Sequence, residues 1–484
     1  MSRPALVVHG HFYQPPRLDP FSGVTPLDPT AAPAHDWNQR ISADCYRPNA
    51  ELGNLAAISW DLGPTLAGWM DRGDPIAYRG FVEGDAGHNG MAQPFHHSIL
   101  PLASAADRRT EVRWGIRDFE VRFGRRPSGM WLPETAVDLA TLRLLGDEGI
   151  AHTILAPWQI EEDPTRDPRR PVRVDLGDGR SIVVVRYDGP LSAAVSFDPG
   201  STVDADAFVA ESVAPAIRAA QQHVVDEPPP LLVIATDGEL YGHHQPGREH
   251  FLARLIGRTA PADLPYDRPS LDDAIAAASV GGLSSGHVRE RTSWSCPHGI
   301  TRWTADCRCV ADGSWKGPLR SALERLAGGV DTATDQLVRA LPGSPDPWPI
   351  RDAWVDVVLG VIDAARFVAE RLPDSTPVYR SILTGAMEAQ RWRLAMFASC
   401  AWFWEGPDRI ETAGAFRAAV RAARLIDELA GTDLERRLVA DLGLIEVDGV
   451  DGATLVTAAL RAVGAPPPSF GAENPSARGL RATG

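Results

Sequence analysis

Seven short apolar segments in the N-terminal part of the chain end abruptly at polar residues or glycine. They are residues 4–11, 76–84, 127–134, 149–157, 181–189, 231–239 and, with a weaker pattern, 286–294. Most of them are rich in β-branched or aromatic residues, and apolar runs of four to eight residues are typical of strands buried in a parallel sheet. The pattern therefore predicts about seven strands.

Helical patterns lie between some of these segments. Residues 107–124 and 136–149 place apolar side chains at helical spacing and end near glycine, and residues 207–224 form a third such stretch with a kink expected at Pro215. Strands that alternate with helices indicate a parallel α/β fold. We expect a seven-stranded (β/α) barrel, an incomplete form of the TIM barrel, and a doubly wound open sheet is the alternative. Both bind ligands at the carboxyl ends of the strands.

The pattern changes from mixed to helical at about residue 320. We expect a catalytic barrel over residues 1–295, a Cys/His-rich connecting segment over 296–320 and an α-helical domain over 321–465. Residues 466–484 are rich in proline, glycine and serine, which predicts a disordered tail.

The amino-acid composition excludes several classes of binding partner. The 484 residues carry a formal net charge of −15, which argues against binding to nucleic acid or to an anionic membrane surface. There is no apolar run long enough to span a membrane and no signal-peptide pattern at the N-terminus. Five cysteines, three of them clustered, do not resemble a secreted disulfide framework. We expect a cytoplasmic protein that acts on a neutral substrate, and the oligomeric state stays undetermined.

Candidate chemical groups follow three of the predicted strands. His9 and His11 would point to the same side of a strand, either as ligands of a sugar or a metal or as a hydrogen-bonded pair. Glu134 would lie near a helix N-terminus, which favours the ionised form that a nucleophile needs; an ordinary helix-start glutamate is the alternative. Asp237 would serve as a general acid if burial raised its pKa, or would only begin an Asp-Gly turn. Two such carboxylates flank a glycosidic bond about 5–5.5 Å apart in retaining enzymes and about 6.5–9.5 Å apart in inverting ones.

Four short motifs occur in the order found in one enzyme family. HGHFYQP (9–15), GHNGMAQPF (87–95), MWLPE (130–134) and ATDGE (235–239) together resemble the motifs of glycoside hydrolase family 57. The resemblance implies a seven-stranded (β/α) barrel and retaining action on α-glucans, with Glu134 as nucleophile and Asp237 as acid/base. Amylases, branching enzymes, 4-α-glucanotransferases and an α-galactosidase share the family, and the motifs do not separate these activities. No cofactor is implied for catalysis.

Further residues are expected to contact the α-glucan or oligosaccharide substrate. The chain has 14 tryptophans, and their ring faces stack on sugars. The expected contacts, from the motifs and from aromatic residues near them, are His9, His11, Gln14, His88, Trp131, Trp158, Glu239, Trp294 and Trp402. His243 and His244 are expected to lie at the rim of the cleft.

A separate cluster of cysteine and histidine follows the last predicted strand. Cys296, His298, Cys307 and Cys309 lie within 14 residues of one another and would form a tetrahedral Cys3His zinc site. Their C-x-H and C-x-C spacing is tighter than that of zinc fingers. Unpaired thiols beside a substrate-side histidine, or a redox-sensitive thiol pair, are the alternatives. A structural zinc ion is thus the candidate cofactor.

Two other functions fit the same motifs. The first is a metal-dependent carbohydrate deacetylase or hydrolase in which His9, His11 and Asp237 hold the metal. The second is a non-catalytic glucan-binding protein that keeps the fold and binds sugar without turnover.

Overall fold

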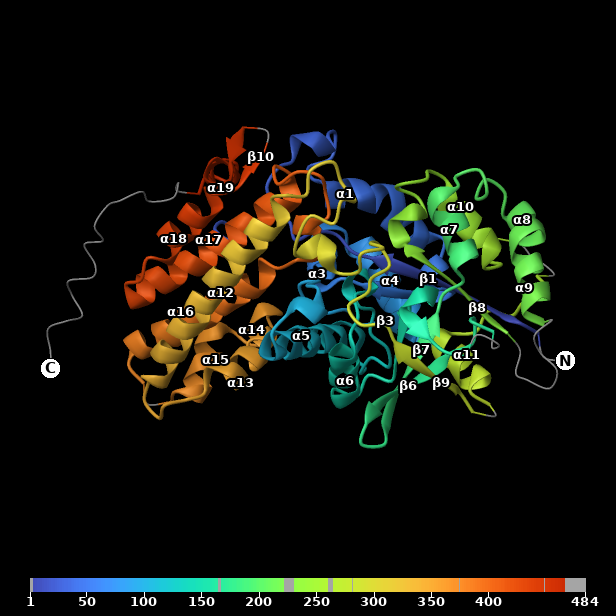
Figure 1. Cartoon of the computed structure of the whole chain (residues 1–484), viewed down its shortest axis with the longest axis horizontal. Coiled ribbons are helices and arrows are strands. Elements are labelled where there is room, and N and C mark those ends of the chain that lie inside the picture. The colour runs from blue at the N-terminus through green and yellow to red at the C-terminus, as the bar shows by residue number, and fades with distance from the viewer. Residues whose placement is uncertain are drawn as a thin grey trace, which may run out of the picture.

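The computed structural model describes most of the chain. The described residues are 3–163, 167–221, 230–259, 264–280, 282–373, 375–447 and 449–465. The strands and the helices around them occupy one side of the molecule, and the C-terminal helices occupy the other (Figure 1). Residues 466–484, for which disorder is predicted, lie outside the described residues. No helix among the described residues is long and apolar enough to cross a membrane.

A parallel sheet forms the centre of the N-terminal part. Its four strands, in the order β3-β2-β1-β8, are β3 (Gly90–Met91), β2 (Ser59–Leu62), β1 (Ala5–Phe12) and β8 (Leu231–Asp237). All three strand pairs are parallel, and His11 on β1 lies opposite Asp61 on β2 and opposite Asp237 on β8. The register therefore brings three polar side chains into one row at the carboxyl ends of neighbouring strands.

A second, mixed sheet lies beside the first. Its strands, in the order β4-β7-β6-β9-β5, are β4 (His152–Leu155), β7 (Arg180–Arg186), β6 (Val172–Gly177), β9 (Ser284–Val288) and β5 (Ile160–Glu161). β4 and β7 are parallel, whereas β6 runs antiparallel to β7. Isolated bridges join Ala92 to Met130 and Gly129 to His152, so residues 127–134, predicted as a strand, contribute only a short link between the sheets. The chain has the predicted α/β fold.

The prediction of a strand over residues 76–84 is wrong, because this segment is helix α4 (Pro75–Gly84). The side chain of Asp74 accepts a hydrogen bond from the backbone N–H of Ala77, and Pro75 occupies the first helical position. Both features favour a helix start. Phe81 is among the side chains that this helix buries, so the β-branched and aromatic content was misleading.

The other predicted helices of this part are largely confirmed. Residues 107–124 correspond to α5 (Ala105–Phe123), which begins two residues earlier, and residues 136–149 contain α6 (Leu139–Asp147). The third stretch is divided into α8 (Ala205–Phe208), a π-helical turn and α9 (Ala214–Gln221), so the break falls just before Pro215. The remaining helices are α1 (Trp37–Ile41), α2 (Arg47–Glu51), α3 (Pro64–Gly73), α7 (Gly189–Phe197), α10 (Arg248–Leu255) and α11 (Leu271–Ala278).

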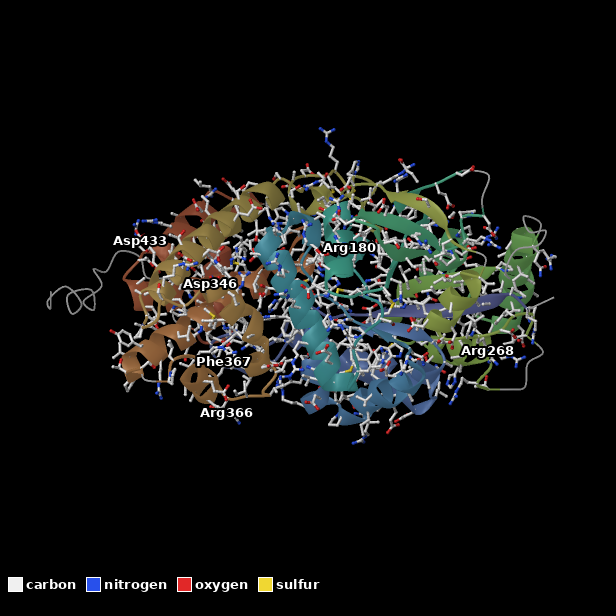
Figure 2. The ribbon with its side chains drawn as sticks, turned by 90° about the horizontal axis from the view of Figure 1, so that it is seen from below. Arg180, Arg268, Asp346, Arg366, Phe367 and Asp433 are labelled. Atoms are coloured by element: carbon white, nitrogen blue, oxygen red, sulfur yellow. The ribbon has the colours of Figure 1, made fainter. Side chains whose placement is uncertain are left out.

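The C-terminal part consists of helices and one small hairpin. These elements are α12 (Lys316–Arg339), α13 (Pro347–Ala353), α14 (Val355–Val358), α15 (Ala364–Arg371), α16 (Pro377–Ala395), α17 (Ile410–Ala430), α18 (Leu434–Leu442), β10 (Glu446–Val447), β11 (Val450–Asp451) and α19 (Gly452–Arg461). Charged side chains such as Asp346 and Arg366 lie on its surface (Figure 2).

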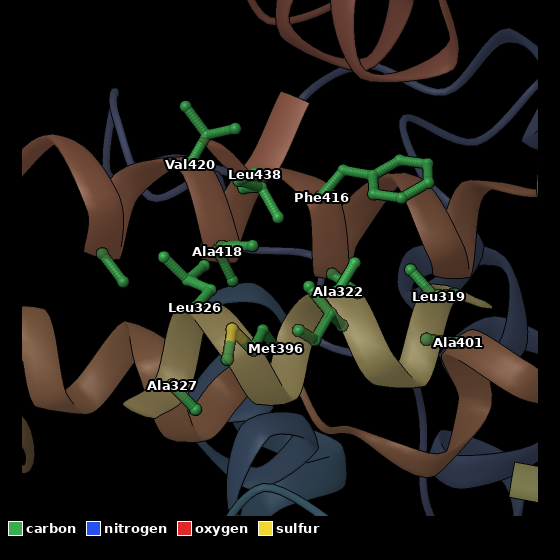
Figure 3. Close-up of a cluster of buried hydrophobic side chains, with 14 of the residues drawn as sticks. Leu319, Ala322, Leu326, Ala327, Met396, Ala401, Phe416, Ala418, Val420 and Leu438 are labelled. Atoms are coloured by element: carbon green, nitrogen blue, oxygen red, sulfur yellow. The ribbon is translucent and has the colours of Figure 1, made fainter. Parts of the chain in front are cut away.

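Apolar packing joins the helical part to the α/β part. Leu319, Leu326 and Phe416 are buried in a cluster between the C-terminal helices (Figure 3). The same cluster contains Ile99 and Ala136 from the N-terminal part. Because apolar burial is the main stabilising term in folding, this shared core holds the helices beside the carboxyl ends of the strands.

Candidate active site

A cavity of about 1360 Å³ opens at the carboxyl ends of β1 and β8. Its walls come from the loop after β1, from the loops that carry Glu134 and Trp294, and from the C-terminal helices α17 and α19. Glu134 and Asp237, predicted as the catalytic pair, both line it. Clefts of this kind, with a few convergent polar groups, are the usual binding sites for small ligands and substrates.

Glu134 has a strained backbone. It lies in a single turn over Pro133–Thr135 with φ 56° and ψ 22°, in the left-handed region that disfavours residues other than glycine. The backbone N–H of Trp294 donates to the Glu134 carbonyl oxygen at 3.1 Å. Helix α6 begins only at Leu139, so the short turn with Glu134 is separate from it. Strain of this kind concentrates at functional sites, where the surrounding contacts hold it.

The carboxylate of Glu134 accepts hydrogen bonds from the cleft wall. Oε2 accepts from Ser295 Oγ at 2.7 Å and from Trp294 Nε1 at 3.4 Å, and Oε1 accepts from Ser399 Oγ at 3.5 Å. Burial raises the pKa of Glu134, and the charge of Asp237 adds to this effect, although the Ser295 hydrogen bond opposes it. The direction is opposite to that expected from a helix N-terminus, because burial outweighs the donors.

Asp237 is the last residue of β8, and its side chain is exposed to the cleft. Solvent reaches it through the cavity, while dense protein surrounds its other sides. Burial by that protein raises the pKa of Asp237, and the charge of His11 acts in the opposite direction. A raised pKa is the direction that a general acid requires, because the group must hold a proton near neutral pH.

A buried ion pair lies beneath these carboxylates. Asp61 Oδ2 is 2.9 Å from His11 Nδ1, and its Oδ1 is 2.9 Å from His9 Nε2. Burial lowers the pKa of His11, but the charge of Asp61 and the hydrogen bond to it outweigh burial and raise that pKa to about 9. His11 is therefore a cation at neutral pH, and its charge favours the ionised forms of Asp237 and Glu134.

His9 does not have the geometry of a metal ligand. Its Nδ1 is 3.0 Å from Ser59 Oγ and its Nε2 is 2.9 Å from Asp61 Oδ1, so both ring nitrogens already have partners. A histidine ligand must offer a free nitrogen lone pair to the metal. The prediction that His9, His11 and Asp237 form a metal-binding set is thus contradicted.

Two expected substrate contacts lie behind the cleft wall. His9 and Trp131 are fully buried and stack with ring centroids 4.8 Å apart, and neither lines the cavity. Trp131 also stacks on His11 at 5.1 Å, which fixes the plane of the charged imidazole. These two motif residues therefore belong to the layer that supports the cleft.

Glu239 and Gln14 line the cavity next to Asp237. Glu239 Oε1 accepts hydrogen bonds from Tyr46 Oη at 2.6 Å and from Gln14 Nε2 at 3.3 Å. Burial, together with the charge of Asp237, raises the pKa of Glu239 to about 7, although the Tyr46 hydrogen bond opposes the rise. The site therefore holds a second group that exchanges a proton near neutrality.

Aromatic rings stand along the cleft. Trp158 is 46% exposed, and its Nε1 donates to the Ser293 carbonyl oxygen at 3.2 Å, while Trp294 lies deeper in the wall. Phe197 and Trp404 are also exposed and line the cavity. Flat exposed rings around a polar centre suit stacking on sugar rings.

The expected contacts from Trp402 and His88 are wrong. Trp402 is buried in the helical core, and its Nε1 donates to the Lys316 carbonyl oxygen at 3.2 Å. The turn Ser399–Trp402 directs that ring inward, and Trp404 takes the position at the cleft. His88 lies on an exposed loop with φ 57° and does not line the cavity.

Sequence reasoning missed several residues of the site. His97 lines the cavity, stacks on Tyr13 with ring centroids 3.7 Å apart, and lies 2.8 Å from Ser399 Oγ through Nδ1. Burial lowers its pKa well below the usual value, so His97 is neutral. The pair His96-His97, just after the GHNGMAQPF motif, was an available signal. No comparable sequence signal indicated Asp61, because it lies in a strand of only four residues.

The rim histidines and the Cys/His cluster lie where the sequence suggested. His243 and His244 line the cavity. Cys296, His298, Cys307 and Cys309 come together so that one potential ligand atom from each lies within 4.8 Å of the others. This cluster does not line the cavity, although Ser295, the residue before Cys296, does.

Comparisons with known families match two segments of the chain. The model described as "Glycosyl hydrolase family 57" matches residues 90–259. The model described as "Domain of unknown function (DUF3536)" matches residues 312–446. A search of curated proteins gives no significant match.

Solved structures share the fold at low sequence identity. An exo-type maltose-forming amylase from Pyrococcus sp. ST04 has a TM-score of 0.75 at 16% identity, over 95% of this chain and 88% of that one. A branching enzyme from Pyrococcus horikoshii has a TM-score of 0.55 at 14% identity, over 95% and 94% of the two chains. An α-amylase from Thermotoga maritima has a TM-score of 0.58 at 12% identity, over 94% and 99%.

Proposed function

We propose that the chain is a retaining glycoside hydrolase or transglycosylase of glycosyl hydrolase family 57 that acts on α-glucans, and the match of that family's model to residues 90–259 supports this proposal. Glu134 is the nucleophile and Asp237 the general acid/base in this proposal. One observation carries it: both carboxylates line the same cavity, and the charge of Asp237 raises the pKa of Glu134. Solved structures of an amylase and a branching enzyme with the same fold support the substrate class.

The two carboxylates would act in two steps. Glu134 attacks the anomeric carbon while Asp237 protonates the leaving oxygen, and a covalent glycosyl-enzyme forms. Asp237 then takes a proton from water or from an acceptor hydroxyl, which releases the sugar with retention. We assign the attack to Oε1 of Glu134, since Oε2 accepts the shorter bonds from Ser295 and Trp294.

The surrounding charges fit this division of roles. The His11 cation opposes the rise in the pKa of Glu134 and so helps to keep the nucleophile ionised. Its ion pair with Asp61 and its stacking on Trp131 hold that charge in place. We assign Glu239 to positioning, because Tyr46 and Gln14 already orient its carboxylate at the edge of the site.

We interpret the two linked sheets as one barrel with seven members. These would be β1, β2, β3, residues 129–131, β4, β7 and β8. The bridges at Ala92–Met130 and Gly129–His152 support one junction. The other junction is supported by the hydrogen bond from the Asp188 N–H to the Val233 carbonyl oxygen at 2.7 Å. Such a barrel would place every carboxyl end of a strand around one cavity.

The test compares the wild type with Glu134→Gln, Asp237→Asn and Glu239→Gln. Turnover of maltooligosaccharides should fall by about 10³-fold or more in Glu134→Gln, since the glutamine amide is too weak a nucleophile to form the covalent bond. Asp237→Asn should lose the same reaction but keep substantial activity on an aryl glycoside, whose leaving group needs no proton. Glu239→Gln should be affected least.

Stereochemistry supplies an independent readout. Proton NMR of the first product should show the α-anomer, because two inversions restore the starting configuration. A β-anomer as first product, or undiminished activity of Glu134→Gln or Asp237→Asn, would overturn the assignment. Sugar binding without any turnover by the wild type would instead favour the non-catalytic glucan-binding function.

A further inference from the structure

We propose that Cys296, His298, Cys307 and Cys309 bind one structural zinc ion, and that this site holds the wall segment with Trp294 and Ser295 against Glu134. The first half stands on the geometry of the cluster alone. The second half rests on the proposed function, since it concerns the nucleophile.

Three distances, among Cys296, His298 and Cys309, match the edges of a zinc tetrahedron, and the ligand atom of Cys307 lies within 4.8 Å of the other three. With Zn–S near 2.3 Å and Zn–N near 2.05 Å, tetrahedral geometry places two sulfurs about 3.8 Å apart and sulfur and nitrogen about 3.6 Å apart. Cys296 Sγ is 3.8 Å from Cys309 Sγ. His298 Nδ1 is 3.9 Å from Cys296 Sγ and 3.4 Å from Cys309 Sγ. A disulfide would require about 2.05 Å between the sulfurs.

Tight turns bring these four side chains together from short spacings. Gly299 has φ 67°, and a Cβ there would lie 2.2 Å from the Arg291 carbonyl oxygen, so only glycine permits the turn after His298. Arg308, between the two cysteines of the C-x-C pair, has φ 58° in the left-handed region. Each pair of ligands therefore turns back on itself. The strain at Arg308 is of the kind found at sites where surrounding contacts or a ligand determine the backbone.

A buried cation lies where the charge of such a site would require one. Zinc with three thiolates and a neutral imidazole carries a net charge of −1. Lys316 is the only lysine in the chain, and its side chain is fully buried. Its Nζ lies 5.5 Å from the centroid of the Trp315 ring and makes no hydrogen bond to a described residue. Burial and the charge of Arg302 lower the pKa of Lys316, whereas negative charge on Cys307, Asp306 and Cys296 acts in the opposite direction. A buried ammonium needs such opposite charge nearby.

The cluster is joined to two of the donors that hold Glu134. Ser295, which donates to Glu134 at 2.7 Å, directly precedes Cys296. Beyond the His298 turn, Trp303 Nε1 donates to the carbonyl oxygen of Ser399, whose hydroxyl donates to the other oxygen of Glu134. A metal that fixes residues 296–309 would therefore fix both sides of the nucleophile. Cys296 and Cys307 are buried and the other two ligands are exposed, so a chelator can reach the ion from one side.

Metal content tests whether the Cys/His cluster binds zinc. Protein purified without added metal, analysed by inductively coupled plasma mass spectrometry, should contain about one zinc per chain. The full-length Cys309→Ser and His298→Gln variants should lose most of it, while the controls Cys45→Ser and His287→Gln should keep it. Replacement by Co²⁺ should give the visible bands and thiolate charge-transfer absorption of tetrahedral cobalt. Wild type without metal, or with Cys296, Cys307 and Cys309 freely titratable in the folded state, would overturn the site whatever the enzyme does.

A pH profile tests whether the zinc site holds the wall segment with Trp294 and Ser295 against Glu134. Weaker donation to Glu134 raises its pKa further, so the acid limb of kcat/KM should move to higher pH in Cys309→Ser, as in Ser295→Ala. Cys309→His, which supplies an alternative zinc ligand at an exposed position, should restore both the metal and the wild-type limb. An unchanged limb in metal-free Cys309→Ser would overturn the link to Glu134 and leave the metal site standing.

Discussion

Replacing Glu239 by glutamine should make the protein more stable at alkaline pH and leave its stability at acid pH nearly unchanged. The side chain is only 3% exposed, and burial raises its pKa from the ordinary value of 4.5 to about 7. The folded chain therefore binds this proton more tightly than the unfolded chain does. The stability that the proton contributes is fully present below about 4.5 and is lost as the pH rises through about 7.

The magnitude follows from the two pKa values. A tenfold change in proton affinity is worth about 1.4 kcal/mol, so the difference between 4.5 and about 7 corresponds to about 3 kcal/mol above pH 7. Glutamine removes the buried charge and keeps an oxygen that can accept from Tyr46. For a chain of 484 residues the entropy of unfolding is about 1 kcal/mol/K, so the melting temperature should rise by about 3 °C at about pH 8.

Scanning calorimetry of the wild type and Glu239→Gln at about pH 4 and about pH 8 measures this difference. Glu83→Gln is the matched control, since Glu83 is exposed on α4 and should change little at either pH. An equal gain at both pH values would mean that packing, and not ionisation, causes the effect. A loss of stability at pH 8 would refute a raised pKa for Glu239.

Three further substitutions test separate parts of the structure. Ser295→Ala removes the 2.7 Å donor to Glu134, so the pKa of Glu134 should rise and the acid limb of kcat/KM should move up by about one pH unit. Trp158→Ala should raise KM for maltooligosaccharides about fivefold with little change in kcat, because an exposed ring at the cleft contributes about 1 kcal/mol of stacking. Gly115→Ala should lower the melting temperature or abolish soluble expression, since its Cβ would lie 1.8 Å from the Gln93 carbonyl oxygen.

Controls for these substitutions come from the same chain. Ser295→Thr keeps a hydroxyl and should keep the wild-type pH profile; a shift equal to that of alanine would show that the hydrogen bond is not responsible. A fall in kcat with unchanged KM would contradict a stacking role for Trp158. Gly68→Ala, whose Cβ would find only Arg122 Nη2 at 3.6 Å, should stabilise helix α3 by about 0.5–1 kcal/mol. Destabilisation there would show that close approach does not explain Gly115.

The elements that could be predicted are those with continuous, local signals. β1, β8 and α5 have long apolar runs or a clear helical period, and the structure contains all three. β2 was missed because SWDL is four residues long and contains an aspartate. Helix α4 was mistaken for a strand because its aromatic and β-branched residues outweighed the helix-start signal at Asp74 and Pro75.

The site could be predicted only in part, because its geometry depends on distant segments. The motifs located Glu134, Asp237 and His11 in one cavity. They could not reveal that Ser295 and Ser399, 161 and 265 residues from Glu134, donate to its carboxylate. The sequence motifs also do not indicate which side chains face the cleft. Trp402 faces the helical core, and Trp404, two residues later, faces the cavity.

Covalent trapping tests the central claim most directly. A fluorinated α-glucosyl fluoride slows release of the covalent intermediate more than its formation, so the glycosyl-enzyme should accumulate. Mass spectrometry of the digested protein should find one glycosyl group per chain on the peptide with Glu134, and Glu134→Gln should remain unlabelled. A glycosyl group on Asp237 or Glu239, or none during demonstrated turnover, would contradict the account.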